Sequence, residues 1–215
     1  MDRRLPLTLG ALVLMVLGWS AMAPFDRLTW LLEVAPVLIA LPVLVATYRR
    51  FPLTAVLYWL IAAHAIVLIV GGTYTYANVP AGFWVRDWLG LARNPYDKLG
   101  HFMQGLVPAL VAREILLRQG YLKSLAMTAF LSTCVALAVS AVYELIEWAA
   151  ALALGQGADE FLGTQGDVWD TQSDMFLALL GSTSGLLLFG RLQLAQIQRL
   201  APRGGAVDAK HASVA

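Results

Sequence analysis

The 215-residue chain has few charged residues, 13% of the total, whereas a soluble globular domain usually carries about 25%. Its formal net charge is only +1, so we expect no nucleic-acid partner. It has a single cysteine, Cys134, which excludes a disulfide framework and a cysteine metal site. The apolar run around Cys134 predicts a buried, inert thiol. Hydrophobic residues make up 59% of the chain, and this composition predicts that a membrane is its solvent.

Long hydrophobic runs are what the sequence has in abundance. Six segments reach the length of about 20 mostly apolar residues that a membrane-spanning helix requires. We therefore predict an all-α polytopic membrane protein, with one bundle of six transmembrane helices over residues 1–190. We expect the cytoplasmic tail, residues 191–215, to continue briefly as a helix and to be largely disordered beyond about residue 200. The predicted spans are Leu5–Ala23, Leu28–Tyr48, Leu53–Gly72, Leu99–Leu117, Ser124–Leu154 and Gln172–Gly190.

The basic residues predict the orientation of the bundle. If the N-terminus is cytoplasmic, 11 of the 15 Lys and Arg residues lie inside, and only Arg27, Arg86, Arg93 and Lys98 lie outside. We therefore expect both termini in the cytoplasm. The first run, with its basic start and Ala-Met-Ala ending, is also typical of a secretory signal peptide. Pro24 directly after that ending is a poor cleavage junction, which favours an uncleaved first helix.

The connection between the third and fourth runs is rich in tryptophan. Trp84 and Trp88 stand beside Arg86 and Asp87, a pattern typical of an amphipathic helix that lies in the membrane interface. Anchoring at the outer surface is the interpretation that we favour for this segment. The alternative is a lid over the polar residues that follow it in the chain.

Three of the predicted helices carry polar residues at the ends that the orientation places outside. Spacings of three and four put such residues on one face of a helix. Ionisable side chains at membrane depth usually turn inward, pair with one another or line a wet cavity, so we expect these to converge. They are Asp97, Lys98, His101 and Gln104 in the fourth helix, Glu144 and Glu147 in the fifth, and Asp167, Asp170, Gln172 and Asp174 at the start of the sixth.

So many carboxyl groups cannot all be ionised at one place without a balancing cation. Lys98 and a protonated His101 each supply one charge, shared protons are a metal-free solution, and a divalent ion supplies more. Carboxylates with one imidazole suit Mg, Mn, Ca or Zn. In that case Glu147 is the candidate general base, with His101 as a second catalytic candidate. The predicted metal ligands are Asp97, His101, Glu144, Asp170 and Asp174. Simple helix capping is the competing interpretation for the aspartates at helix starts.

The motifs YDKLGHF, YELIEW and GDVWDTQSDMFLALLG resemble the YjdF family of bacterial inner-membrane proteins over roughly the first 190 residues. More distantly, Asp97, Lys98, His101, Phe102, Glu144, Asp170, Asp174 and Gly181 are similar to VanZ-like proteins, which are associated with glycopeptide (teicoplanin) resistance. The chain departs from the VanZ-like pattern at Glu147 and Trp148, where a glutamine is common, and at Leu177 to Leu180, where an asparagine is frequent. The resemblance implies a bacterial inner membrane, and no substrate is carried over.

Two functions follow from this interpretation. The first is a metal-assisted enzyme that acts on a lipid or lipid-linked envelope precursor at the outer leaflet, although no HExxH or phosphatase signature is present. The second is a non-enzymatic lipid-binding or accessory protein, in which the polar cluster holds three helix ends together. Transport is less favoured, because carriers usually place their site at the midplane and often show inverted repeats.

Overall fold

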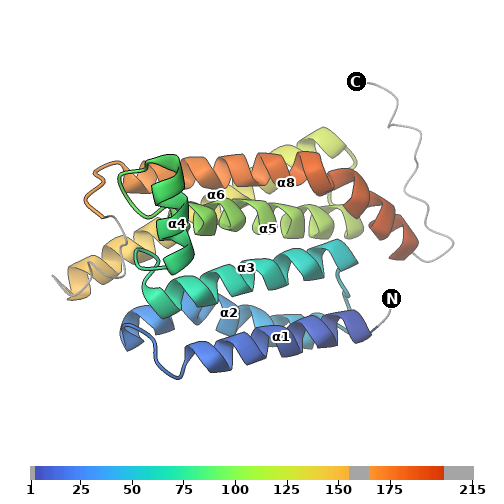
Figure 1. Cartoon of the computed structure of the whole chain (residues 1–215). Helices are drawn as coiled ribbons and strands as arrows, with labels where there is room; N and C mark the ends of the chain where they lie inside the picture. The colour runs from blue at the N-terminus through green and yellow to red at the C-terminus, as the bar shows by residue number, and fades with distance from the viewer. Residues whose placement is uncertain (1–2, 155–164, 201–215) are drawn as a thin grey trace.

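The computed structural model describes residues 3–154 and 165–200, and within these ranges all regular secondary structure is helical, as predicted. Six long helices run alternately in opposite directions along one bundle (Figure 1). The first three form one half of it and the last three the other, while a short helix stands across one end. The helices are α1 (Arg4–Ser20), α2 (Arg27–Thr47), α3 (Ala55–Tyr74), α4 (Pro80–Leu89), α5 (Tyr96–Arg118), α6 (Leu125–Leu154) and α8 (Asp170–Leu200).

The six long helices match the six predicted spans, and four of them, α2, α3, α6 and α8, are long and apolar enough to cross a membrane. With 17 residues, α1 is shorter. The more polar α5 includes Asp97, Lys98, Arg113 and Glu114. It nevertheless lies inside the bundle, because it packs on α3, α6 and α8, which shield it. The structure thus supports a multi-pass membrane protein, and the full count of six crossings and their orientation stay predictions.

The outer surface of the bundle is apolar, as a hydrocarbon solvent requires. Leu7, Val45 and Leu187 on three different helices each expose more than 70% of their surface. Cys134 is also exposed, on α6, so the prediction of a buried thiol is wrong. In a membrane protein an apolar run faces lipid as readily as core, so such a run does not reveal which face is buried. Residues 201–215, for which we predict disorder, lie outside the described residues.

Glycine brings α5 and α8 into backbone contact. A Cβ atom at Gly105 would overlap the backbone carbonyl of Ala178, and one at Gly181 would overlap the carbonyl of Phe102. Side chains therefore cannot separate the two helices at these positions. The contact fixes how the start of α5 lies against the start of α8, and these two segments carry most of the predicted polar residues.

A buried carboxylate ties the halves together at the end of the bundle where α1 begins. Glu114 accepts hydrogen bonds from the amide (2.9 Å) and hydroxyl (2.6 Å) of Thr54, the N-cap residue of α3. It also accepts one from Arg118 at 2.9 Å. Nearby, Gln193 accepts from Arg113 at 2.7 Å. Both oxygens of Glu114 are thus bonded, and the carboxylate caps α3 from α5. We call these five residues the Glu114 network.

Candidate functional site

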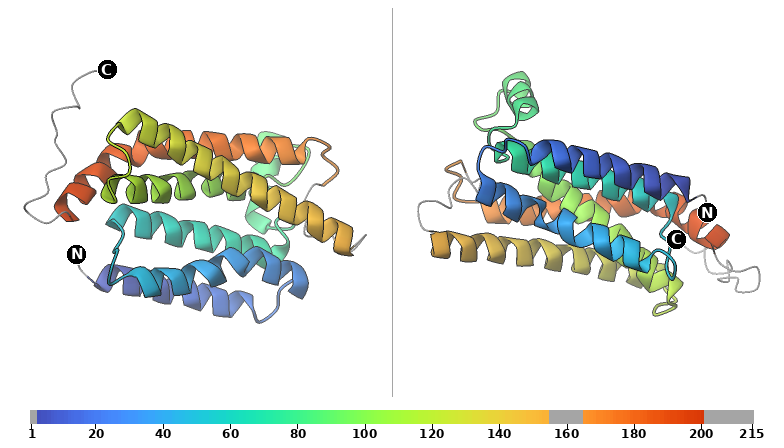
Figure 2. Two further views of the ribbon diagram at one scale, coloured as in Figure 1. Left: turned by 180° about the vertical axis from the view of Figure 1, so that it is seen from behind. Right: turned by 90° about the horizontal axis from the view of Figure 1, so that it is seen from below.

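The predicted polar residues lie at the opposite end of the bundle, beside α4. Three segments meet there: the start of α5, the second half of α6 and the start of α8 (Figure 2). The residues divide into two parts that share Asp174. The ion-pair network consists of Arg93, Lys98, Asp167, Asp170 and Asp174, and the His101 cluster consists of Asp97, His101, Gln104, Glu144, Glu147 and Asp174.

The ion-pair network joins the start of α5 to the start of α8. Arg93 contacts Asp170 at 2.5 Å and Asp167 at 3.1 Å, while Lys98 contacts Asp170 at 3.1 Å and Asp174 at 2.8 Å. Burial lowers the pKa of the Arg93 guanidinium, but its hydrogen bond to Asp170 and the charges of both aspartates outweigh burial and raise that pKa. The aspartates of α8 are therefore balanced by two cationic side chains, one of which, Arg93, our prediction did not include.

The loop before α5 is held so that Arg93 faces these aspartates. Asn94 exchanges two hydrogen bonds of 3.1 Å with Gln165, one donated by its amide and one accepted by its carbonyl. Its side chain donates to the carbonyls of Ala77 and Val79, each at 3.0 Å. Asn94 is 1% exposed, so these bonds form a buried clasp between the segment after α3 and the segment before α8.

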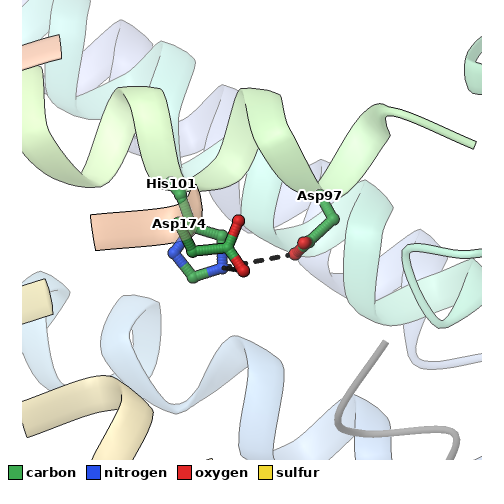
Figure 3. A group of neighbouring side chains, drawn as sticks. All are labelled: Asp97, His101 and Asp174. Carbon is green, nitrogen blue, oxygen red and sulfur yellow. Dashed lines mark ion pairs between the residues drawn. The ribbon is translucent and has the colours of Figure 1, made fainter. Parts of the chain in front are cut away.

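His101 lies between carboxylates from three helices. Its Nε2 is 3.3 Å from Asp97 Oδ1 and 3.8 Å from Asp174 Oδ2 (Figure 3). Its Nδ1 is 3.2 Å from Gln104 Oε1 and 3.7 Å from Glu144 Oε1. An amide oxygen accepts hydrogen bonds, so in the tautomer that donates to Gln104 the proton of His101 lies on Nδ1. The lone pair of a neutral His101 then lies on Nε2, facing the two aspartates.

Among the residues that the structure describes, two sets of three side chains lie close enough together to be metal ligands, and both contain His101. In each set, one ligand atom per residue lies within 4.8 Å of the others. Around a cation with ligand distances of about 2.1 Å, neighbouring ligand atoms are roughly 3.0–3.4 Å apart. The Nε2 distances to Asp97 and Asp174 are close to that range. The other set consists of His101, Glu144 and Glu147. Asp170, a predicted ligand, belongs to neither set and is bound by Arg93 and Lys98 instead.

A small cavity of ≈ 20 Å³ opens beside His101, which is enough room for about one water molecule. Two buried carboxylate oxygens of the cluster, Asp97 Oδ2 and Glu144 Oε1, accept no hydrogen bond within the described residues. Buried acceptors are normally satisfied, so an oxygen in this state indicates a missing water or ion. The cavity is lined by Glu33, Leu68, Tyr76, Asp97, Gly100, His101, Gln104, Tyr143 and Glu147.

Five of these lining residues were absent from the predicted site, and three of the five, Glu33, Tyr76 and Tyr143, carry ionisable side chains. The Tyr143 hydroxyl donates to Glu33 at 2.9 Å, and the Tyr143 ring meets the His101 ring edge-on at 6.2 Å. Tyr76 follows the left-handed turn that ends α3, and its ring packs against Gly71 so tightly that a Cβ there would overlap it. Burial raises the pKa of Tyr76 well above its usual value, which keeps its hydroxyl protonated. Glu33 is the lone acid of an otherwise apolar helix, and this signal was available in the sequence.

Two of the other predicted features have simple outcomes. Gln172 is exposed on α8, and its neighbour Ser173 meets the Lys98 ammonium at 2.5 Å instead. A short helix, α4, is present where we predicted an interfacial helix, and it exposes 73% of Trp84 and 83% of Trp88, while its place at the membrane surface stays a prediction. In the described part of the chain no residue of α4 lines the cavity, so the structure gives the lid interpretation no support.

The fold and the surface define the class of protein: a helical, multi-pass membrane protein with a buried polar cluster at one end. The chain belongs to the family described as predicted membrane protein (DUF2238), which matches residues 5–195. It is 63% identical over 185 residues to the inner membrane protein YjdF of Escherichia coli (strain K12), covering 86% of this chain and 88% of that protein. The predicted YjdF family is confirmed, and an inner-membrane location is supported by this relative. No solved structure matches the chain. The VanZ-like resemblance finds no support in these comparisons.

Proposed function

We propose that the His101 cluster binds a divalent metal ion and that the protein is a membrane-embedded hydrolase. Its substrate would be a lipid or lipid-linked envelope precursor at the outer leaflet. The observation that carries the proposal is the orientation of His101. Gln104 Oε1 lies 3.2 Å from Nδ1, where it can accept a hydrogen bond from that nitrogen, and Nε2 on the other side of the ring is 3.3 Å from Asp97 and 3.8 Å from Asp174. A histidine ligand oriented by a hydrogen bond at its other nitrogen is the usual arrangement in metal sites.

Charge balance supports a cation at this place. Lys98 and Arg93 are engaged with the aspartates of α8. Asp97 and Glu144 both pair with His101, and Glu147 lies in one group of possible ligands with His101 and Glu144. A divalent ion would balance two of these carboxylates, and it would give the unbonded oxygens of Asp97 and Glu144 a partner.

The arrangement also suits hydrolysis. A metal held by one imidazole and two carboxylates keeps coordination positions open for water or substrate, and a bound water loses its proton more easily. Glu147 lines the cavity beside His101 and is 9% exposed, so it is placed to accept that proton. The lipid-facing surface of the bundle brings membrane-soluble substrates close to the site.

Metal content tests the first part of the proposal. We expect purified wild-type protein to retain about one divalent ion per chain by elemental analysis. Asp97→Asn removes a ligand whose Oδ2 makes no other bond, and His101→Ala removes the imidazole, so both variants should lose the ion. Asp87→Asn is the matched control, because Asp87 pairs with Arg86 on α4 outside the cluster. A wild-type protein without bound metal, after purification in metal-containing buffer, would refute the site.

Catalysis is tested separately. We expect the metal-loaded protein, incubated with an extract of envelope lipids, to produce a hydrolysed species that mass spectrometry detects. Glu147→Gln should retain the metal and lose the product, because it removes the base and not a ligand of the Asp97, His101 and Asp174 set. Equal product formation by the wild type and Glu147→Gln would exclude Glu147 as the base.

A second candidate function is a metal-free accessory or lipid-binding protein. The observation that favours it is the ion-pair network, in which Lys98 and Arg93 join α5 to α8 without any ligand. On this alternative the polar end is a structural clasp. Variants of His101 would then lower stability without changing any metal content or product.

A further inference from the structure

The start of α1 and the loop that joins α2 to α3 lie at the opposite end of the bundle from the start of α5 (Figure 1). Residues of these two segments line a second hollow. Its volume is ≈ 440 Å³, and it is lined by Arg3, Tyr48, Arg49 and Pro52. We call it the arginine cleft. We propose that the arginine cleft binds an anionic phosphate group, of the kind that an acidic phospholipid headgroup or a soluble phosphate ester carries.

The lining of the cleft has the chemistry that phosphate binding needs. Arg3 and Arg49 supply two guanidinium groups and Tyr48 supplies a hydroxyl, and the lining within residues 3–154 and 165–200 contains no carboxylate. Guanidinium groups bind phosphate through paired, charge-assisted hydrogen bonds. Arg3 is also the N-cap residue of α1, so the positive end of that helix dipole lies at the cleft.

The loop that forms one wall of the cleft is held in place. The Phe51 amide donates to the Thr47 carbonyl at 2.8 Å, which closes the turn after α2. Arg118 donates to the Pro52 carbonyl at 2.6 Å, and its guanidinium lies 3.8 Å above the Phe51 ring. Arg118 is itself fixed by Glu114. The wall is therefore preorganised, which lowers the entropy lost when a ligand binds.

The position of the cleft fits a membrane lipid. It lies where α1 and α3 begin and α2 ends, which is the depth of the lipid headgroups when these helices cross the membrane as predicted. Basic pockets between transmembrane helices on the cytoplasmic side commonly take acidic headgroups, and our predicted orientation puts this end in the cytoplasm. The cleft shares no residue with the His101 cluster, so the two proposals stand or fall separately.

Binding by the full-length protein in detergent micelles tests the proposal. Native mass spectrometry would count bound phosphatidylglycerol and bound phosphatidylcholine, which carries a phosphate but no net charge. We expect preferential retention of phosphatidylglycerol. Arg3→Gln and Arg49→Gln should each weaken its binding about fivefold. Arg191→Gln should leave binding unchanged, because it removes an exposed arginine of α8 outside the cleft.

A competition arm separates the two sources of phosphate. If glycerol 3-phosphate displaces the lipid at equal concentration, the ligand of the cleft is a soluble phosphate ester. If the lipid stays bound, its acyl chains contribute to binding and the ligand is the lipid. Thermal unfolding of each variant shows that the fold is intact, and Arg49→Lys should retain part of the affinity. Equal retention of both lipids, or equal binding by wild type, Arg3→Gln and Arg49→Gln, would overturn the proposal.

Discussion

The close contact between α5 and α8 predicts that replacing a glycine by alanine, which normally stabilises a helix, will destabilise the protein here. Alanine is favoured over glycine inside a helix by roughly 1 kcal/mol. In Gly181→Ala, however, the new methyl group would overlap the Phe102 carbonyl, and backbone cannot rotate out of the way as a side chain does. Overpacking of a core typically costs about 1–3 kcal/mol, and a clash with backbone belongs at the upper end. The net result should be a loss of about 2 kcal/mol.

Thermal unfolding in detergent measures this loss. For a chain of this size, about 2 kcal/mol corresponds to a decrease of roughly 4–8 °C in the midpoint. Gly10→Ala is the matched control, because Gly10 lies in α1 and a Cβ there meets nothing within 4 Å. The control should be neutral or slightly stabilising. If Gly181→Ala unfolds at the same temperature as Gly10→Ala, the backbone contact between α5 and α8 does not exist as described.

Three further predictions test other parts of the structure. Glu114→Ala should lower the free energy of unfolding by about 3 kcal/mol, because it leaves Arg118 without its buried carboxylate. Chemical denaturation measures this loss, and an unchanged free energy of unfolding would contradict the Glu114 network. Lys98→Met and Asp174→Asn should each destabilise, with a coupling of roughly 1 kcal/mol in a double-mutant cycle, whereas additive effects would exclude the ion pair. In a variant that retains Trp88 as its only tryptophan, lipids brominated near the headgroup should quench the fluorescence more than lipids brominated at the end of the acyl chain. Stronger quenching by the chain-end bromine would place α4 deeper in the membrane than its interface.

The helices could be predicted from the sequence because hydrophobic length alone defines them. Each predicted span overlaps one long helix, and the bounds differ most at α8, which continues past Gly190 to Leu200 through the part of the tail that we expected to be helical. Whether an individual side chain points into the protein core or toward lipid could not be predicted in the same way. Lipid and protein core are equally apolar, so the pattern around Cys134 looks the same for a buried and an exposed position.

The polar residues could be predicted to gather, but not how they would pair. Asp97, His101 and Asp174 were all expected at one end, because orientation and helix rise give each of them a depth. Depth does not give direction around a helix axis, so Glu33 was not assigned to the site. Arg93 lies in a loop, and the Asn94 clasp ties that loop to the segment before α8, beside the aspartates. That clasp depends on contacts between segments 71 residues apart in the chain.

The contrast between the two polar ends of the bundle is the strongest argument for a function at one of them. The carboxylate of Glu114 is fully buried, and both of its oxygens are bonded to protein groups, so it needs nothing further. Glu144 is buried almost as well, at the other end, but one of its oxygens accepts no hydrogen bond in the described structure. A protein that needed only a clasp at this end could complete it, as it does at Glu114. The unbonded acceptors of Glu144 and Asp97 beside His101 therefore point to a partner that the polypeptide itself does not supply.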